Sequence, residues 1–354
     1  MLKPVDNAPR ETRLADMGVV RVQGADAVKF LQGQVSNDVA LLTAERSILA
    51  GLHNPQGRAI ALLRLVLAGP EEILALVPRE LAAPVATRLA KFVLRAKVKI
   101  VDASAEWEVA GVQLGGVAEG FAAASVGAAR RDEEGRQWVC VDADGAVGGM
   151  GDVGGAGDVG GAGDGDSSAA GETTSTSRWL VASRAGAPPA EPRGAEANAS
   201  PDVGNPLPSM SREEWRALDI AAGIPQVYAV TSETFVAQML NLDLVNGIAF
   251  DKGCYTGQEV IARAHYRGKV KRRMQRFRTV APAKLNAGDA GTLGDSRSFK
   301  VVDAVQRNDG RCEFLAVTTF GDSADDTTDA PAAAPSQTGA VNAEQLPLPY
   351  SLPA

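Results

Sequence analysis

Residues 251–263 read DKGCYTGQEVIAR, and the rest of the chain can be organised around this stretch. From Lys252 to Glu259 it combines an amine, a thiol, a phenol, an amide and a carboxylate with two glycines. A buried segment rarely carries so many polar groups, because each of them would need its own partner. The apolar run at 247–250 predicts a strand before the turn, and the apolar positions from Val260 onward predict a helix that begins near Gly257 or Gln258.

A strand, a glycine-containing turn and a helix in this order can bind a ligand. Such a turn points backbone N–H groups and the positive end of the helix dipole towards whatever binds there. Gly253 and Gly257 are expected to allow a positive φ or a close approach of the backbone to a ligand.

Cys254 is the candidate catalytic residue in this turn. Lys252 and the amino terminus of the helix would both favour the thiolate form of its side chain. The alternative is a small buried cysteine in a tight turn. The sequence leaves open whether a chemical role would be that of a nucleophile, a redox contact or a transient ligand of an iron–sulfur cluster.

The bulk composition is that of a globular protein. The chain has 354 residues, enough for two or three domains, and 45% of them are hydrophobic. No apolar run approaches the roughly 20 residues of a membrane span, and residues 1–6 contain no apolar signal core. The three cysteines lie far apart without a CxxC spacing, which argues against a disulfide framework and a zinc site. We therefore expect a cytoplasmic location and no membrane partner.

The net charge of −7 is unevenly distributed. Residues 142–177 carry seven acids and residues 321–354 carry five, and neither segment contains a lysine or an arginine. Outside these segments 36 bases face 31 acids, so the rest of the chain is mildly basic. A mildly basic body suits an anionic ligand, whether small or polymeric.

Helical and strand patterns are mixed along the chain without a regular βαβ rhythm. Residues 60–67 form a nearly continuous apolar run that predicts a strand, and residues 81–96 place apolar side chains at helical spacing. Ser211 and Glu214 match a capping box that would open a further helix. This mixture predicts an α+β fold rather than a parallel doubly wound sheet.

Three ordered blocks of the sequence resemble the YgfZ family. The segment KGCYTGQE at 252–259 fills every fixed position of the family signature K-G-C-Y-x-G-Q-E. The segment FLQGQVSND at 30–38 and the segment NPQGR at 54–58 are similar to two amino-terminal family patterns. Members of this family are folate-binding proteins related to the aminomethyltransferase of the glycine cleavage system.

The resemblance implies a three-part α+β body around a central channel, with a small C-terminal β-barrel-like domain. The channel would bind tetrahydrofolate or a derivative, and the family is connected with the maintenance of iron–sulfur enzymes and with tRNA modification. The aminomethyltransferases carry an aspartate pair, one member of which is catalytic, where this chain has Ala61 and Leu62. Without a carboxylate there, aminomethyl transfer by the usual route is not expected.

The blocks and the composition together predict a domain plan. It consists of an N-terminal tail (1–13), a GcvT-like folate-binding region (14–105), a strand pair of the middle domain (106–141 and 178–184), a disordered Gly/Asp-rich insertion (142–177), a Pro-rich linker (185–210), the second half of the folate-binding region (211–272), a C-terminal β domain (273–320) and a disordered tail (321–354).

Eight residues of the matched blocks, and Arg263 shortly after the KGCYTGQE block, are expected to bind the folate. They are Lys252, Gly253, Tyr255, Gln258, Glu259, Arg263, Asn37, Asp38 and Arg58. Gln258 and Glu259 could bond the polar edge of the pterin, although an acid in the first helical turn is stabilised by the dipole in any case. Lys252 could meet a carboxylate of the glutamate tail or extend to solvent, and Asp38 could line the channel or stabilise its own loop. Tyr255 could stack on the pterin or anchor the turn.

Residues 263–278 hold eight lysines and arginines in sixteen positions, interleaved with His265, Tyr266 and Phe277. This run could bind tRNA phosphates, and the alternative is a solvated basic strand. The candidate nucleic-acid contacts are Arg267, Lys269, Lys271 and Arg272. The two histidines of the chain show no metal-ligand spacing, so no metal site is expected.

The sequence therefore predicts a cytoplasmic folate-binding protein of the YgfZ type that assists the assembly or repair of iron–sulfur proteins. Its expected partners are folate, iron–sulfur client proteins or their assembly machinery, and tRNA. The alternative is an enzyme that transfers a one-carbon unit from folate to tRNA or to a small amine.

Overall fold

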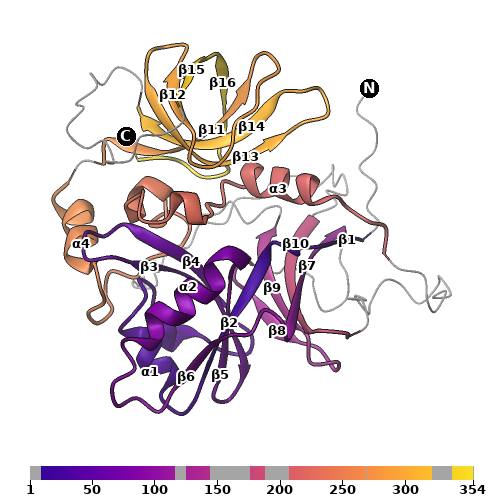
Figure 1. Cartoon of the computed structure of the whole chain (residues 1–354), viewed down its shortest axis with the longest axis vertical. Coiled ribbons are helices and arrows are strands. Elements are labelled where there is room, and N and C mark those ends of the chain that lie inside the picture. Colours follow the sequence, from indigo (N-terminus) through magenta and orange to yellow (C-terminus); the bar gives the residue numbers. More distant parts are fainter. Residues whose placement is uncertain are drawn as a thin grey trace, which may run out of the picture.

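The structure is a computed structural model that describes residues 9–115, 125–143, 176–187, 207–268, 270–320 and 337–353. Three β-sheets form its main parts, and the helix α3 (Arg212–Ala221) lies between the C-terminal sheet and the other two (Figure 1). The α+β prediction is confirmed, because strands dominate and the few helices do not alternate with them in a βαβ pattern.

The amino-terminal sheet has the strand order β3-β4-β5-β2-β6, with antiparallel neighbours throughout. Its strands are β2 (Met17–Gln23), β3 (Ile48–His53), β4 (Ala59–Gly69), β5 (Glu72–Pro78) and β6 (Lys99–Asp102). The strand β4 is buried on both faces, which explains its nearly continuous apolar sequence. One face packs on α1 (Ala27–Gln32) and α2 (Arg79–Ala90), and the other packs on the second sheet.

The second sheet has the order β1-β7-β10-β9-β8. Its strands are β1 (Arg10–Arg13), β7 (Trp107–Gly115), β8 (Ala129–Arg131), β9 (Gln137–Ala143) and β10 (Thr176–Arg184). The helix α3 lies against this sheet and begins with the predicted capping box, in which Ser211 and Glu214 bond each other's backbone N–H groups. The aromatic ring of Trp215 rests on Gly111, where any larger residue would collide with it.

The C-terminal sheet has the order β15-β12-β13-β14-β11-β16 and curves into a nearly closed barrel (Figure 1). Its strands are β11 (Arg272–Thr279), β12 (Ala290–Leu293), β13 (Ser298–Gln306), β14 (Cys312–Thr319), β15 (Gln337–Val341) and β16 (Ala343–Leu346). All neighbours are antiparallel except β12 and β15. The expected β-barrel-like domain is thereby confirmed.

The expectation of a disordered tail at 321–354 is wrong for residues 337–353. The strands β15 and β16 complete the two sides of the barrel, and the sequence beyond them contacts the body again. The Tyr350 hydroxyl donates a hydrogen bond to the Gly223 carbonyl at 2.8 Å, and the side chain of Leu348 packs close to Gly223. The high alanine and proline content of the tail gave no local signal for these strands. Their backbone hydrogen bonds are made with β11 and β12, which lie far away in the sequence.

Other local predictions also change. Arg10–Arg13 of the expected N-terminal tail is the edge strand β1, which pairs with β7. The segment 247–250 is not a strand, and α2 ends at Ala90, six residues before the predicted end. Residues 144–175, which make up most of the predicted insertion, and residues 188–206 of the predicted linker lie outside the described residues.

Candidate functional site

The KGCYTGQE turn leads into the helix α4 (Gln258–Tyr266), as its sequence predicts. Gly257 is the N-cap residue and has a φ of 85°, a conformation that L side chains rarely adopt. A Cβ atom at Gly257 would lie 2.5 Å from the Asn54 carbonyl oxygen and 3.0 Å from the Cα atom of Gly57. The NPQGR turn and the start of α4 therefore pack backbone against backbone, and both turns need glycine at this contact.

Gly253 does not have a positive φ, which was one of the two roles that the sequence suggested, and the close approach of its backbone to a ligand stays a prediction. A Cβ atom at Gly253 would meet nothing within 4 Å. The backbone at this position thus faces open space beside the exposed Cys254.

Lys252 holds two of the three matched blocks together. Its Nζ donates hydrogen bonds to the carbonyl oxygens of Gln32 at 2.7 Å, of Val35 at 2.8 Å and of Asn37 at 2.8 Å. These carbonyls end α1 and line the loop that follows it. Burial lowers the pKa of Lys252 to about 8, and the charge of Asp38 opposes this shift. The ammonium group caps the loop, and no hydrogen bond in the described part of the chain joins it to the Cys254 thiol.

The polar residues of the FLQGQVSND block bind their own surroundings. The Asn37 side-chain amide donates to the carbonyls of Leu49 at 2.8 Å and Asn246 at 2.6 Å. The Asp38 carboxylate accepts from the Gln32 side chain at 2.8 Å and from the Ala40 backbone at 3.0 Å. The structure thus favours the alternative in which Asp38 stabilises its own loop.

The other predicted folate contacts are divided between buried and exposed positions. Arg58 donates to the Thr234 carbonyl at 2.6 Å, and Tyr255 is buried with the Lys252 ammonium 5.2 Å from its ring centre. The Gln258 side chain makes a long 3.5 Å bond to the Lys252 carbonyl. Glu259 and Arg263 form an ion pair one helical turn apart, with side chains 85% and 72% exposed, and such pairs add little stability.

The basic run does not form one continuous cationic face, because β11 sends alternate side chains to opposite sides. Arg273 is buried and binds the Asp243 carboxylate through two hydrogen bonds of 2.9 and 2.8 Å. Phe277 belongs to the barrel core rather than to the surface. Of the four candidate nucleic-acid contacts, Arg267 and Lys271 are exposed and Arg272 donates to Ser298 at 3.3 Å. Lys269 lies outside the described residues.

An aromatic cluster lies at the end of α4. The His265 ring stacks on Phe250 with 3.7 Å between ring centres, and Tyr266 meets both rings edge-on. Tyr266 is 68% exposed. Two of the aromatic residues predicted to interleave with the basic run are therefore at the surface, close to Arg267.

His53 is a buried histidine that the sequence analysis considered only as a metal ligand. Neither ring nitrogen has a hydrogen-bond partner among the described residues, and its Nε2 atom lies under Gly51, where a Cβ would approach within 2.2 Å. Burial lowers the pKa of His53 to about 4, and the polar backbone groups of Gly57 and Arg58 oppose this shift by a smaller amount. Among the described residues no group of three or more His, Cys, Asp or Glu side chains could hold a metal ion.

We expect His53 to make stability depend on pH. The folded state keeps the ring neutral, whereas the unfolded chain binds a proton below about pH 6.5, so stability falls as the pH falls from 6.5 towards 4. The full shift corresponds to about 3 kcal/mol. Urea unfolding at pH 7 and pH 5 should show a smaller loss in His53→Gln than in wild type. His265→Gln, at an exposed site, should keep the wild-type loss, and an unchanged slope in His53→Gln would contradict the prediction.

A second candidate site lies where the three sheets meet. It is a cavity between the two amino-terminal sheets, the polar side of α3 and the barrel. Its apolar lining includes Leu14, Met17, Leu49, Leu62, Leu76, Val141, Leu180 and Trp215, and its polar lining includes Asp16, Arg64, Arg212, Arg216, Asp219, Gln226, Tyr228 and Asp303. We call it the central cavity.

Three of the six charged side chains that line the central cavity are paired, namely Arg216, Asp219 and Asp303. Asp303 accepts hydrogen bonds from Arg216 at 2.5 Å and from the Tyr228 hydroxyl at 3.0 Å. Asp219 is bound at 2.5 Å by Arg178, which also pairs with Asp142. Burial and the Asp303 charge raise the pKa of Tyr228 well above its ordinary value, so its hydroxyl remains protonated.

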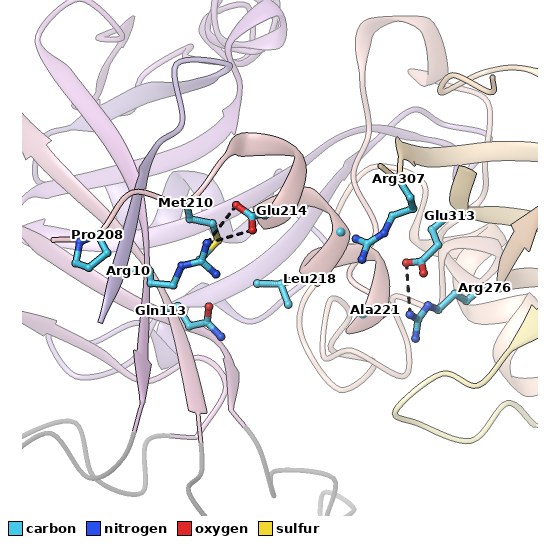
Figure 2. Close-up of a pocket in the computed structure, with 11 residues that line it drawn as sticks. Arg10, Gln113, Pro208, Met210, Glu214, Leu218, Ala221, Arg276, Arg307 and Glu313 are labelled. Carbon is cyan, nitrogen blue, oxygen red and sulfur yellow. Dashed lines mark hydrogen bonds and ion pairs between the residues drawn. The ribbon is translucent and has the colours of Figure 1, made fainter. Parts of the chain in front are cut away.

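A second cavity of about 660 Å³ lies on the other side of α3. Figure 2 shows that its side chains form two groups, one around Arg10 and Glu214 and one around Arg276 and Glu313. The Arg10 guanidinium binds both oxygens of Glu214 at 3.1 and 3.2 Å, and Arg276 pairs with Glu313 at 3.6 Å. Both glutamates are therefore neutralised within the chain, and this cavity is the weaker candidate site.

Comparison with known proteins places the chain in a family. No protein-family model matches it. The tRNA-modifying protein YgfZ of Yersinia pseudotuberculosis serotype O:1b is 30% identical over 308 residues, which cover 86% of this chain and 82% of that protein. The chain belongs to the YgfZ family. A further relative with the same name, from Enterobacter sp. strain 638, is 29% identical over 304 residues and covers 84% and 82% of the two chains.

The fold of this YgfZ family member is also found in a solved structure. The glycine cleavage system aminomethyltransferase T from Bartonella henselae superposes with a TM-score of 0.60 over 88% of this chain and 78% of that chain. The identity is 12%, so the likeness concerns the fold. The described residues contain no helix that is long and apolar enough to cross a membrane.

None of the nine predicted folate contacts of this YgfZ family member lines the central cavity. The matched blocks instead meet at the junction of α4, the NPQGR turn and the loop after α1. The residues that line the cavity were missed because they are dispersed along the chain. One signal was available in the sequence, since Arg64 interrupts the apolar run of β4.

Proposed function

We propose that this YgfZ family member binds tetrahydrofolate, or a derivative of it, in the central cavity and assists the assembly or repair of iron–sulfur proteins. The observation that carries the proposal is the position of this cavity, at the junction of the three parts of a fold shared with an aminomethyltransferase. The curated relatives are named tRNA-modifying proteins, and support for an iron–sulfur enzyme that modifies tRNA would account for that name.

The residues of the central cavity fit a flat heterocycle with a polar edge. Leucines from β3, β4 and β5 and the indole of Trp215 supply apolar walls, while Arg64, Gln226 and Tyr228 supply polar groups. The cavity volume is about 100 Å³, which is less than the ordinary size of a site for a drug-sized ligand. We therefore expect side chains at its mouth, such as the exposed Arg212, to move when a whole folate binds.

The alternative role as a one-carbon transferase has less support. Folate would supply nitrogen atoms that carry one-carbon units, and the protein would have to supply an acid or base beside them. Ala61 and Leu62 are buried and carry no carboxylate. Arg64 makes the same strand cationic, which opposes the development of positive charge on a bound amine. These residues favour binding over aminomethyl transfer.

The surface around Cys254 is proposed as the contact for a protein or RNA partner. Cys254 is exposed, whereas Cys140 and Cys312 are buried and burial raises the pKa of Cys140 to about 11. Tyr266 and Arg267 lie exposed at the end of the neighbouring helix α4. An exposed aromatic ring beside a cation suits a nucleotide base and its phosphate. Binding of tRNA that weakens steeply with salt would support this part of the proposal.

Calorimetric titration of tetrahydrofolate into the anaerobic protein tests the folate site. We expect saturable binding to wild type and at least a roughly tenfold weaker affinity in Leu62→Trp, because the larger ring would fill the cavity. Glu259→Ala should bind as wild type does, and thermal unfolding of both variants shows whether they fold.

Absence of binding to wild type would overturn the folate proposal. Loss of binding in Glu259→Ala, with binding kept in Leu62→Trp, would move the ligand from the central cavity to the KGCYTGQE turn.

A further inference from the structure

Arg64 is a buried charge of the central cavity for which the described part of the chain supplies no partner. It lies in the middle of β4, opposite Leu49 on β3 and opposite Leu76 on β5. All three side chains line the central cavity, and Arg64 is only 8% exposed. A buried guanidinium thus faces the cavity from a floor that is otherwise apolar.

Within the described ranges, no side chain or backbone group makes a hydrogen bond or an ion pair with Arg64. Burial lowers the pKa of Arg64 to about 10, and the charge of Asp219 opposes this shift. Asp219 already accepts a hydrogen bond from Arg178, and Asp303 already binds Arg216. Buried charges are ordinarily paired, because an unpaired guanidinium loses its hydration without compensation. A buried arginine without a partner therefore indicates a ligand that accepts hydrogen bonds from its guanidinium group.

The ligand group that best matches Arg64 is a pair of adjacent acceptors. A guanidinium presents parallel N–H donors in a rigid plane, and in DNA recognition it binds the O6 and N7 acceptors of guanine in this way. The oxidised pterin ring of folic acid carries the same pair of acceptors as its 4-oxo group and the neighbouring N5. In the tetrahydro form N5 bears a hydrogen, and the 4-oxo group is the acceptor that both forms share. The apolar side chains beside Arg64 suit the faces of such a ring, whereas the charged tail of a folate is better solvated at the mouth.

We propose that Arg64 is the specificity-determining residue of the central cavity and binds the edge of the pterin that carries the 4-oxo group. This inference rests on the proposed folate site. It adds that the cavity selects ligands by the acceptor character of this edge. A pterin that carries an amino group at position 4 presents a donor to the guanidinium and is rejected.

The test compares folic acid with aminopterin, its 4-amino analogue, as calorimetric probes of the intact protein. Wild type should bind folic acid about 10- to 100-fold more tightly than aminopterin. Arg64→Met should bind the two probes within about threefold of each other, because the side chain keeps its length but loses the donors. Arg64→Lys should discriminate less than wild type, since a single ammonium lacks the paired donors. Arg276→Met, in the second cavity, should retain the wild-type ratio.

Thermal unfolding of the ligand-free protein gives an independent readout. Replacement of an unpaired buried cation by methionine should raise the melting temperature by about 3 °C or more. A fall in melting temperature would show that Arg64 already has a structural partner. An equal ratio of folic acid to aminopterin affinity in wild type and Arg64→Met would show that another residue distinguishes the two rings. Either result overturns the inference while the folate site stands. If neither probe nor tetrahydrofolate binds wild type, both the inference and the proposed function fail.

Discussion

The Gly257→Ala variant should be less stable than wild type by about 3 kcal/mol or more, which for a chain of this size is a fall in melting temperature of at least about 6 °C. Two costs add at this position. An L residue is strained at a φ of 85°, and the new Cβ would lie 2.5 Å from the backbone oxygen of Asn54. Neither atom can move by a side-chain rotation, because the contact is between two turns of the backbone.

Gly253→Ala is the matched control for this prediction. It makes the same chemical change four residues earlier in the same motif, where the added methyl group meets open space. It should leave the melting temperature within about 2 °C of wild type. Equal effects of the two substitutions, measured by differential scanning calorimetry, would show that the two turns do not touch as described.

The Lys252→Met variant should lose about 2–4 kcal/mol of unfolding free energy. The substitution keeps the length of the side chain but removes the donors of three carbonyl groups at the end of α1 and in the following loop. Within the residues that the structure describes, no other group donates a hydrogen bond to these carbonyls, so the loop at 33–38 should also exchange its amide hydrogens faster.

Lys29→Met provides the comparison for Lys252→Met. Lys29 belongs to the same helix α1 but is exposed, so its replacement should change the unfolding free energy by less than about 0.5 kcal/mol in urea titrations. A similarly small loss of unfolding free energy in Lys252→Met would mean that water replaces the ammonium group. The inferred role of Lys252 in holding the loop after α1 would then be wrong.

Much of the local structure around the motif follows from the sequence. The start of α4 at Gly257 and Gln258, the capping box of α3 and the apolar strand β4 occur as predicted, because short-range patterns determine them. The roles of individual side chains are harder to predict from the sequence. The sequence predicts that Lys252 acts on Cys254, meets a ligand or extends to solvent, yet it bonds a loop that is some 220 residues away in sequence.

The candidate site itself depends on contacts between distant segments. Arg64, Asp219 and Asp303 come from three different parts of the chain and meet only when the sheets, α3 and the barrel are assembled. The basic run likewise depends on contacts between distant segments. A count of its charges does not reveal that Arg273 is buried against Asp243. Recognition of the family blocks located a structural junction, whereas the cavity had to be found in three dimensions.

The contact between Tyr350 and Gly223 has a consequence for the order in which the protein matures during translation. Gly223 begins the segment that carries Gln226 and Tyr228 into the central cavity, and its neighbours Leu348 and Tyr350 are synthesised long after it. The same is true of β15 and β16, which complete the barrel. The two amino-terminal sheets can thus form while the ribosome is still elongating the chain, but the cavity wall acquires its final support only after residues 337–353 have emerged. A nascent chain stalled before this point would have most of its hydrophobic core and an unfinished ligand site.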